Sequence, residues 1–257
     1  MNADMPMFSV VIPAYLNERH LEEAVQSALN QDFPDPGIEV IIVYDPSSDN
    51  TENIIDELAA SNGSITVIKN AERLGVAESR NIGMRKARGE YVAFLDADDI
   101  WHKEKLSRQH ELIKRTGCGL CYSSYCFVNE NGQRVGKPFI VAEEIDYGGL
   151  LYGNIIGTTT CVISSEIAKN FKMDNNFYHE DFVCWLTILR SGHRACGITD
   201  VLVDYRLRTG SRSWDKLKMP RHRWNVYRKF LKFSLIKCIW YWGIGVIRAV
   251  RKYWGAR

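Results

Sequence analysis

The sequence has no apolar run long enough to cross a membrane. Its most apolar stretch, residues 238–247, spans ten residues, and extending it back to Phe230 brings in Lys232 and Lys237. A spanning helix needs about twenty consecutive apolar residues, so we expect no transmembrane segment. Residues 1–8 also lack the basic start and the apolar centre of a signal peptide. We therefore expect a cytoplasmic protein.

Two kinds of phosphate-binding loop and a complete zinc motif are also missing. No Gly-x-Gly-x-x-Gly follows the first apolar segment and no Gly-x-x-x-x-Gly-Lys occurs, which argues against a dinucleotide fold and a P-loop. The seven cysteines are scattered. Cys118 and Cys121 have zinc-like spacing, but no second Cys or His pair lies at a suitable distance. Reduced cysteines fit this pattern better than a structural zinc site.

Acidic residues are absent from the C-terminal end. From Lys216 to Arg257 the chain has 12 Lys and Arg and no Asp or Glu, whereas the remainder has 21 basic and 31 acidic residues. Aromatic residues alternate with these bases from Arg221 onward. This pattern predicts a helix that lies on an anionic membrane, on the inner face of the cell membrane. Packing on the domain, an oligomer contact and nucleic-acid binding are the alternatives, and we expect no nucleic acid.

Apolar and amphipathic segments alternate over the first hundred residues. Strands are expected at 8–13, 38–43, 64–68 and 90–95, with helices at 17–33, 50–58 and 76–87. This order predicts a parallel sheet with helices on both faces. Ligands bind beyond the carboxyl ends of such strands. The polar residues that follow the first, second and fourth strands (13–15, Asp45 and 96–99) should therefore share one edge.

The acidic stretch Leu95–Asp99 follows a buried strand directly. Three carboxylates placed so close together raise one another's pKa, and burial raises it further. A divalent cation removes this conflict, and hard oxygen ligands suit Mg²⁺ or Mn²⁺. The alternative is a solvated acidic turn in which Asp99 caps a helix expected at 102–115. The convergence of polar turns on one edge favours a metal and nucleotide site.

The second half is less regular. We expect a hairpin of strands 119–128 and 135–141 around the turn 129–132, a strand at 158–163 and a strand region at 195–207. A short helix should run over 164–171 with Ser164 as its N-cap. A longer helix should run from about Tyr178 to Arg190, with Trp185 on its inner side.

Five motifs make the function more specific. They are Phe8–Tyr15 with Asn17, Ile41–Thr51, Gly75–Gly83, Leu95–Asp99, and Glu180–Asp181 followed by Trp185. Their order resembles the family-2 inverting glycosyltransferases with the GT-A fold, of the type that builds bacterial O-antigen, capsule and exopolysaccharide. The resemblance covers roughly residues 8–213. It implies an α/β fold with a Rossmann-like mixed sheet flanked by helices over 1–213. This domain would comprise a nucleotide-binding half (8–101) and an acceptor-binding half (102–213). A basic amphipathic helical tail (214–257) would follow it.

The resemblance also implies a role for each matching residue. Asp181 would be the general base, Asp98 the ligand of Mn²⁺ or Mg²⁺, Asp45 the acceptor of the uracil N–H, and Asp96 a ribose contact. The other donor-binding residues would be Pro13, Ala14, Tyr15, Asn17, Glu18, Arg80 and Ala97. The residues that contact or support the acceptor would be His179, Glu180 and Trp185.

The chemistry of sugar transfer is consistent with these roles. A nucleoside diphosphate that leaves C1 of a sugar carries negative charge, which a cation at Asp98 would stabilise. The acceptor hydroxyl becomes a nucleophile when a carboxylate takes its proton. Direct attack then inverts the anomeric carbon. We expect a nonprocessive, metal-dependent hexosyltransferase that uses a UDP-sugar donor, with a lipid-diphosphate-linked glycan as the acceptor.

Two positions depart from the family pattern. Tyr44 stands where an acid is frequent, so uracil recognition would depend more on Asp45. Arg208 replaces the histidine of a Tyr-Arg-x-His-x-x-Ser-x-Ser segment. Arginine cannot ligate a metal but pairs well with phosphate. We therefore expect Arg206 or Arg208 to contact the donor diphosphate.

Three other functions fit the sequence less well. A processive synthase should have several spanning helices and a Gln-x-x-Arg-Trp motif, but the chain has only Arg221–Trp224 with Pro220 before it. A nucleotidyltransferase should have a glycine-rich first turn. A noncatalytic module that binds nucleotide-sugar or glycan remains the main alternative, and the presence of both Asp98 and Asp181 argues against it.

Overall fold

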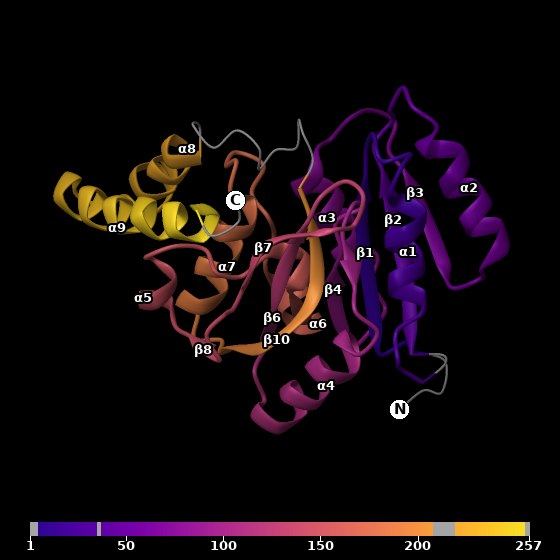
Figure 1. Cartoon of the computed structure of the whole chain (residues 1–257), viewed down its shortest axis with the longest axis horizontal. Coiled ribbons are helices and arrows are strands. Elements are labelled where there is room, and N and C mark those ends of the chain that lie inside the picture. The colour runs from indigo at the N-terminus through magenta and orange to yellow at the C-terminus, as the bar shows by residue number, and fades with distance from the viewer. Residues whose placement is uncertain (1–4, 35–36, 208–218, 255–257) are drawn as a thin grey trace.

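The computed structural model describes residues 5–34, 37–207 and 219–254. One sheet of ten strands forms its centre, and helices cover both faces (Figure 1). The strands are β1 (Phe8–Ala14), β2 (Ile38–Tyr44), β3 (Ile65–Lys69), β4 (Tyr91–Phe94), β5 (Ile100–Trp101), β6 (Leu120–Val128), β7 (Arg134–Phe139), β8 (Glu144–Ile145), β9 (Val162–Ser164) and β10 (Ala195–Arg206).

The helices lie between the strands and at the C-terminal end. They are α1 (Leu21–Leu29), α2 (Thr51–Ser61), α3 (Val76–Lys86), α4 (Lys105–Thr116), α5 (Tyr147–Leu150), α6 (Ser165–Asn170), α7 (Glu180–Arg190), α8 (Met219–Asn225) and α9 (Leu235–Trp254). A 3₁₀ turn covers Thr158–Thr160, and a π-helical turn covers Val226–Phe230.

The sheet is mixed, as expected. Its order is β3-β2-β1-β4-β9-β6-β10-β5, while β7 pairs with β6 and β8 with β10. The first four strands are parallel, and β9 joins them to the parallel pair of β6 and β10 by running antiparallel to both neighbours. The carboxyl ends of β1, β2 and β4 therefore meet at one edge.

Alternating side chains of the strands divide the core between the two faces. Val10 and Ile12 of β1 pack with α1, α2 and α4, whereas Val11 packs with α3, α6 and α7. Gly83 of α3 lies so close to β1 that a Cβ atom there would come within 2.2 Å of the Val11 side chain. Glycine at this position lets α3 approach the sheet beside the site.

Two expectations for secondary structure were wrong. Ile100–Trp101 forms β5 on β10, so the next helix begins at Lys105 and Asp99 caps no helix. The segment 158–163 begins as a 3₁₀ turn, and only its end joins the sheet. By contrast, Ser164 does cap α6, because its Oγ accepts a hydrogen bond from the Ile167 N–H.

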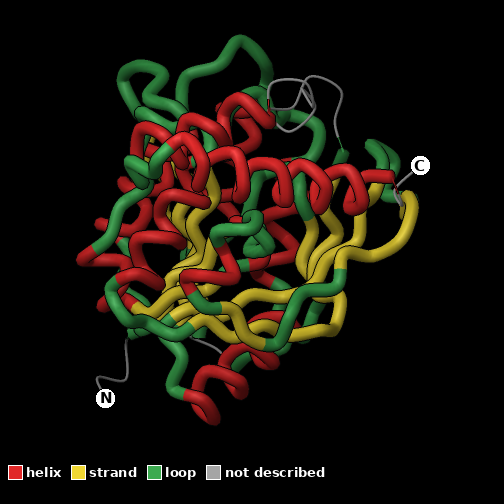
Figure 2. Tube along the Cα trace, turned by 90° about the vertical axis from the view of Figure 1, so that its left-hand side faces the viewer, coloured by secondary structure: helices red, strands yellow, loops and turns green. Residues whose placement is uncertain are grey.

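The C-terminal helices pack on the side of the domain that carries α5 and α7 (Figures 1 and 2). Cys238 of α9 is fully buried, and the rings of Tyr241 and Tyr152 lie 5.0 Å apart. The Tyr227 hydroxyl donates to the Leu151 carbonyl at 2.7 Å. The other face of α9 exposes large apolar side chains: Leu235, Ile236, Ile239, Trp240 and Ile247. Within the described residues, no helix is long and apolar enough to cross a membrane.

Candidate active site

The loops after β1 and β2 are tied together at the carboxyl edge of the sheet. The Asn17 N–H donates to Thr51 Oγ1 at 2.9 Å, and the Asn50 N–H donates to Glu18 Oε2 at 2.9 Å. Asn17 also uses its side chain, whose Oδ1 accepts from the Tyr15 N–H at 2.9 Å. These bonds fix the loop that begins with Pro13 and Ala14 at the end of β1. The structure thus brings the predicted first-strand residues to the edge where β2 ends.

Asp45 lies at the end of β2 and is buried. Its two carboxylate oxygens accept hydrogen bonds at 2.8 Å from Asn70 Nδ2 and from the Gly75 N–H. Gly75 has φ +87°, a conformation that favours glycine, and it precedes α3 directly. Asp45 therefore holds the start of α3 against the sheet. The expected contact with a uracil N–H would use the remaining lone pairs of the same carboxylate.

The acidic loop after β4 is anchored by Arg206 at the end of β10. Arg206 is buried, and its Nε donates to the Asp98 carbonyl while its backbone N–H donates to Asp99 Oδ1, both at 2.8 Å. The guanidinium also donates to the Glu130 carbonyl and to Glu23 Oε2. Burial, followed by the charges of Asp98 and Asp96, raises the pKa of Asp99 well above its usual range.

Two expectations change as a result. Arg206 uses its guanidinium on protein acceptors and fixes the acidic loop instead of contacting a diphosphate. Asp99 is buried, and its Oδ1 accepts from the Arg206 N–H of β10, so Asp99 is not an exposed helix cap. The pairing of β5 with β10 brings it next to that strand. The other candidate for the diphosphate, Arg208, lies outside the described residues.

A buried arginine joins the acidic loop to the helix that carries the expected base. Arg80 of α3 donates to Asp96 Oδ1 at 2.5 Å and to Glu180 Oε1 at 2.9 Å. Burial alone would lower the pKa of Arg80, but Asp96 and Glu180 raise it above its usual range. Arg80 was expected to contact the nucleotide or its phosphates. In the structure it links two acidic side chains, which brings Asp96 and α7 to the same site.

Asp181 lies in the first turn of α7, beside this ion pair. Its Oδ2 accepts hydrogen bonds from Asn154 Nδ2 at 2.9 Å and from Thr158 Oγ1 at 3.3 Å, while its Oδ1 accepts from the Phe182 N–H at 2.7 Å. Burial raises the pKa of Asp181, although Arg80 and the hydrogen bonds from Phe182 and Thr158 oppose the shift. A carboxylate in this environment is held in one orientation and is a stronger base than an exposed aspartate.

The neighbours of Asp181 have different positions. Glu180 is buried against Arg80, so it supports the site from inside. Trp185 is fully buried and packs on Phe94 of β4 with ring centroids 6.1 Å apart. It therefore supports α7 and does not reach an acceptor. His179 is half-buried at the start of α7, where its ring lies edge-on to Tyr178 at 5.7 Å.

Sequence reasoning missed three residues that belong to this edge. Asn154 and Thr158 hold Asp181, and the guanidinium of Arg73 lies 3.9 Å from the ring centroid of Tyr15. No local pattern distinguishes these residues, since each acts through a partner distant in the chain. Only the expected acceptor-binding half, residues 102–213, included Asn154 and Thr158, without singling them out.

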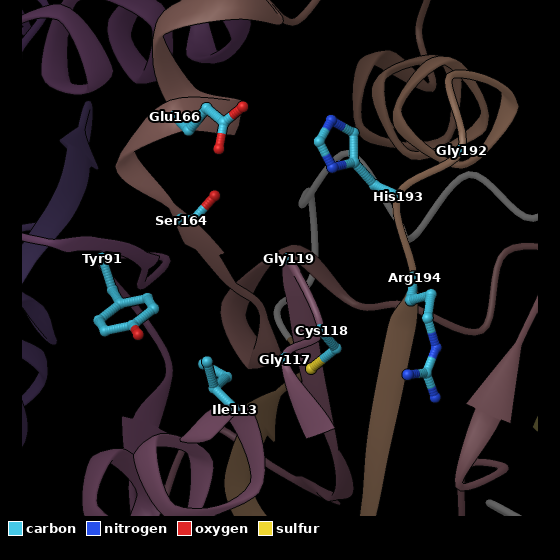
Figure 3. A pocket seen from close by; sticks show the side chains of 10 residues that line it. All are labelled: Tyr91, Ile113, Gly117, Cys118, Gly119, Ser164, Glu166, Gly192, His193 and Arg194. Atoms are coloured by element: carbon cyan, nitrogen blue, oxygen red, sulfur yellow. The ribbon is translucent and has the colours of Figure 1, made fainter. Parts of the chain in front are cut away.

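A surface cavity lies at the opposite edge of the sheet. It has a volume of about 430 Å³ and is lined by residues at the amino ends of strands, such as Tyr91, Gly119 and Arg194 (Figure 3). Cys118, Glu166 and His193 also face it. Ligands of α/β sheets bind at the carboxyl ends, so this cavity is separate from the candidate active site.

The residues of the acidic loop are suited to a metal that the substrate helps to hold. Within the described ranges, no group of three His, Cys, Asp or Glu side chains is arranged as a complete metal site. Mg²⁺ and similar cations commonly bind through one or two carboxylates together with substrate phosphates. The half-buried Asp98 fits this second arrangement, because Arg206 fixes its backbone at the edge where a diphosphate would lie.

The raised pKa of Asp181 predicts a pH effect. Asp181 acts as a base only when ionised, so kcat should fall as the pH drops through its pKa, and this acidic limb should lie above the pKa of an ordinary aspartate. Thr158→Val removes a donor that stabilises the ionised form, so the limb should move to higher pH. Thr160→Val is the matched control, because Thr160 Oγ1 donates to the Gly157 carbonyl. A limb that stays in place in Thr158→Val, or moves as far in Thr160→Val, would contradict this assignment.

The fold and the site define a glycosyltransferase of the GT-A class. The family model described as Glycosyl transferase family 2 matches residues 9–181, and the chain belongs to this family. TuaG of Bacillus subtilis (strain 168), named for teichuronic acid biosynthesis, is 34% identical over 91% of this chain and 92% of its own length. WfgD of Escherichia coli, a UDP-Glc:alpha-D-GlcNAc-diphosphoundecaprenol beta-1,3-glucosyltransferase, is 30% identical over 96% of this chain and 95% of its own length.

Solved structures show the same fold. TarS of S. aureus (residues 1–349) in complex with UDP-GlcNAc superposes with a TM-score of 0.75 at 20% identity, over 95% of this chain and 72% of that one. The mannosyltransferase PcManGT from Pyrobaculum calidifontis, in complex with GDP-Man and Mn²⁺, gives a TM-score of 0.72 at 19% identity, over 99% and 77% of the two chains. The expected GT-A fold is thus confirmed.

Proposed function

We propose that this protein is an inverting, nonprocessive glycosyltransferase that moves a hexose from a UDP-sugar to a hydroxyl of a lipid-diphosphate-linked glycan in bacterial surface polysaccharide synthesis. The observation that carries this proposal is the Arg80 bridge between Asp96 and Glu180. It joins the donor-side loop to the turn that holds Asp181. The names of relatives such as WfgD support the donor and acceptor classes.

The proposed mechanism is a single displacement. The Asp181 carboxylate, oriented by Asn154 and Thr158, takes the proton of the acceptor hydroxyl as its oxygen bonds to C1 of the sugar. The bond from C1 to the diphosphate oxygen breaks on the opposite face, so the anomeric configuration inverts. Mn²⁺ or Mg²⁺ held by Asp98 and the diphosphate would supply the charge that stabilises the leaving group. Asp45 and Tyr15 would bind the nucleotide end of the donor.

We also propose that the tail, residues 214–257, holds the enzyme on the inner face of the cell membrane. One face of α9 packs on the domain through Cys238 and Tyr241, and the opposite face exposes Leu235, Ile236, Ile239, Trp240 and Ile247. A helix of this kind lies in the membrane interface when basic residues adjoin its apolar stripe. Lys232 and Lys237 adjoin it here. Packing and membrane contact thus use different faces of one helix.

Charge placed on the exposed stripe should weaken membrane binding. Ile236 is 82% exposed, so Ile236→Glu should not disturb folding, yet it would have to bury a carboxylate at the lipid surface. We expect the fraction that sediments with anionic vesicles to fall at least several-fold. Glu57→Gln, an exposed change on α2, is the control. Equal sedimentation of Ile236→Glu and the unaltered protein would contradict the membrane role of α9.

A donor panel tests the proposed reaction. Purified protein is given UDP-, GDP- and dTDP-hexoses, Mn²⁺ or Mg²⁺, and a synthetic sugar-diphospho-lipid acceptor. We expect transfer from a UDP-hexose that stops when a chelator removes the metal and returns when the metal is restored. Binding of nucleotide-sugar with no transfer to any glycan acceptor would favour a noncatalytic binding module.

A further inference from the structure

A second cavity lies between the turn that precedes α7 and the C-terminal helices. It has a volume of about 290 Å³ and is lined by Asn175, Asn176, Phe177, Tyr178, His222, Asn225 and Lys229. Cavities that enclose drug-sized ligands begin at about this volume, so a small polar group would fit. None of these residues has a role in the mechanism described above.

The two walls of this cavity are fixed against each other by aromatic contacts. The rings of Tyr178 and His222 stack with centroids 4.1 Å apart and planes inclined by 10°. Phe177 packs edge-on to Phe230 at 5.8 Å. On the outer side, Trp242 Nε1 donates to the Pro220 carbonyl at 2.7 Å, which attaches α8 to α9. The cavity therefore has a defined shape to which the tail contributes one wall.

The polar groups of the lining suit an anion that carries hydroxyl groups. Lys229 supplies a positive charge, and Asn175 and Asn225 supply amide donors and acceptors. In the described part of the chain, these three side chains have no hydrogen bond or ion pair. Among the described residues that line the cavity there is no carboxylate, and the adjacent Asp174 accepts from Asn176 Nδ2 at 2.7 Å. An ammonium group among amides is a suitable site for phosphate.

The position of the cavity relates it to the acceptor. Tyr178 lies three residues before Asp181, on the turn that leads into α7. The hydroxyl that reacts at Asp181 belongs to a sugar whose own diphosphate must lie a short distance away. Beyond α8, the chain continues into α9 with its exposed apolar stripe, where a lipid chain would enter the membrane. The cavity lining thus comes from the turn that leads to the base and from the segment that leads to the surface proposed to meet lipid.

We propose that this cavity binds the diphosphate of the lipid-linked acceptor, with Lys229 as its main charged contact. The inference depends on the proposed acceptor class. It gives the C-terminal tail a second role, because α8 and the π-helical turn would then select acceptors that carry a diphosphate. The donor diphosphate would be held separately at the acidic loop.

The test compares two water-soluble acceptors that share one sugar, a short-chain alkyl diphosphate and an alkyl glycoside without phosphate. Lys229→Gln should raise KM for the diphosphate acceptor about tenfold, because a charge-assisted contact is lost. KM for the glycoside and for the donor should stay the same. Lys169→Gln removes the same charge from an exposed position on α6 outside the cavity, and it should leave all three constants unchanged. Inorganic pyrophosphate binding, measured by calorimetry, should weaken in Lys229→Gln alone.

Each other outcome would overturn the inference. An equal rise in KM for both acceptors would mean that the cavity recognises the sugar. A rise for the donor alone would assign Lys229 to the donor diphosphate. Unchanged acceptor constants with weaker sedimentation on anionic vesicles would assign it to lipid headgroups. If the unaltered protein transfers sugar to neither acceptor, the proposed function fails. The anion site is then tested by calorimetry alone. Equal pyrophosphate binding by Lys229→Gln and the unaltered protein would show that the cavity is not an anion site.

Discussion

Asp181→Asn is expected to lower kcat for sugar transfer by about a thousandfold, within the range that a general base contributes. Asparagine has the same shape, and its amide oxygen can still accept from Asn154 and Thr158. It cannot take a proton from the acceptor. The amide nitrogen of asparagine would face the Phe182 N–H in place of Oδ1, so the free energy of unfolding should fall modestly, and the loss of a buried charge offsets part of that cost. Affinity for the nucleotide-sugar, measured by calorimetry, should change little.

A matched control separates this effect from a general loss of charge. Asp200 is exposed and pairs with Arg108 at 2.5 Å on the surface, so Asp200→Asn should transfer sugar at the normal rate. If Asp181→Asn kept its rate, Asp181 would not be the base. If it lost nucleotide-sugar affinity together with its rate, the residue would belong to the donor site instead.

Arg80→Met is expected to lower the free energy of unfolding by about 3–5 kcal/mol, the typical result of removing one partner from a buried ion pair. Glu180 would remain buried without its counter-charge, and Asp96 would lose its partner. Since Arg80 also lowers the pKa of Asp181, the acidic limb of kcat should move to higher pH. Urea unfolding and a pH–rate profile measure the two effects.

Arg85→Met on the same helix provides the comparison. Arg85 pairs with Glu78 at 2.8 Å, but 60% of its side chain is exposed. Surface pairs contribute about 0–1 kcal/mol, so this variant should remain close to the unaltered protein and keep its pH profile. Equal losses of stability in Arg80→Met and Arg85→Met would show that the buried bridge has no special role.

The fold could be predicted from the sequence because its signals are local. Four short apolar runs separated by amphipathic helices determine a parallel sheet, and the strands lie within one or two residues of the expected positions. The acidic loop, Asp45 and the turn after β1 follow directly from that arrangement, since polar residues after parallel strands meet at one edge. The Ser164 N-cap of α6 could also be predicted from the sequence, because a cap depends on residues only three positions apart.

The roles of the arginines could not be read in the same way. Arg80 meets Glu180 across 100 residues, and Arg206 meets Asp99 across 107. A charge pattern shows that an arginine is present but not which carboxylates surround it. Arg80 and Arg206 were therefore expected near phosphate, whereas the structure places both among protein acceptors, where they hold the site together.

The tail shows a different limit. Its basic and aromatic composition suggested either membrane contact or packing, as though the two excluded each other. The structure shows that α9 buries Cys238 and packs the partly buried Tyr241 on one face, and exposes Ile236 and Trp240 on another. Helical periodicity in a sequence rich in apolar residues all round does not reveal which stripe faces the domain.

The anomeric configuration of the product tests the proposed displacement at Asp181 most directly. The measurement is the NMR coupling across the new glycosidic bond, made on the product of a single transfer from a UDP-hexose of known configuration. A single base with no covalent intermediate predicts complete inversion relative to the donor. Retention of the donor's configuration would require a different mechanism and would contradict the role assigned to Asp181.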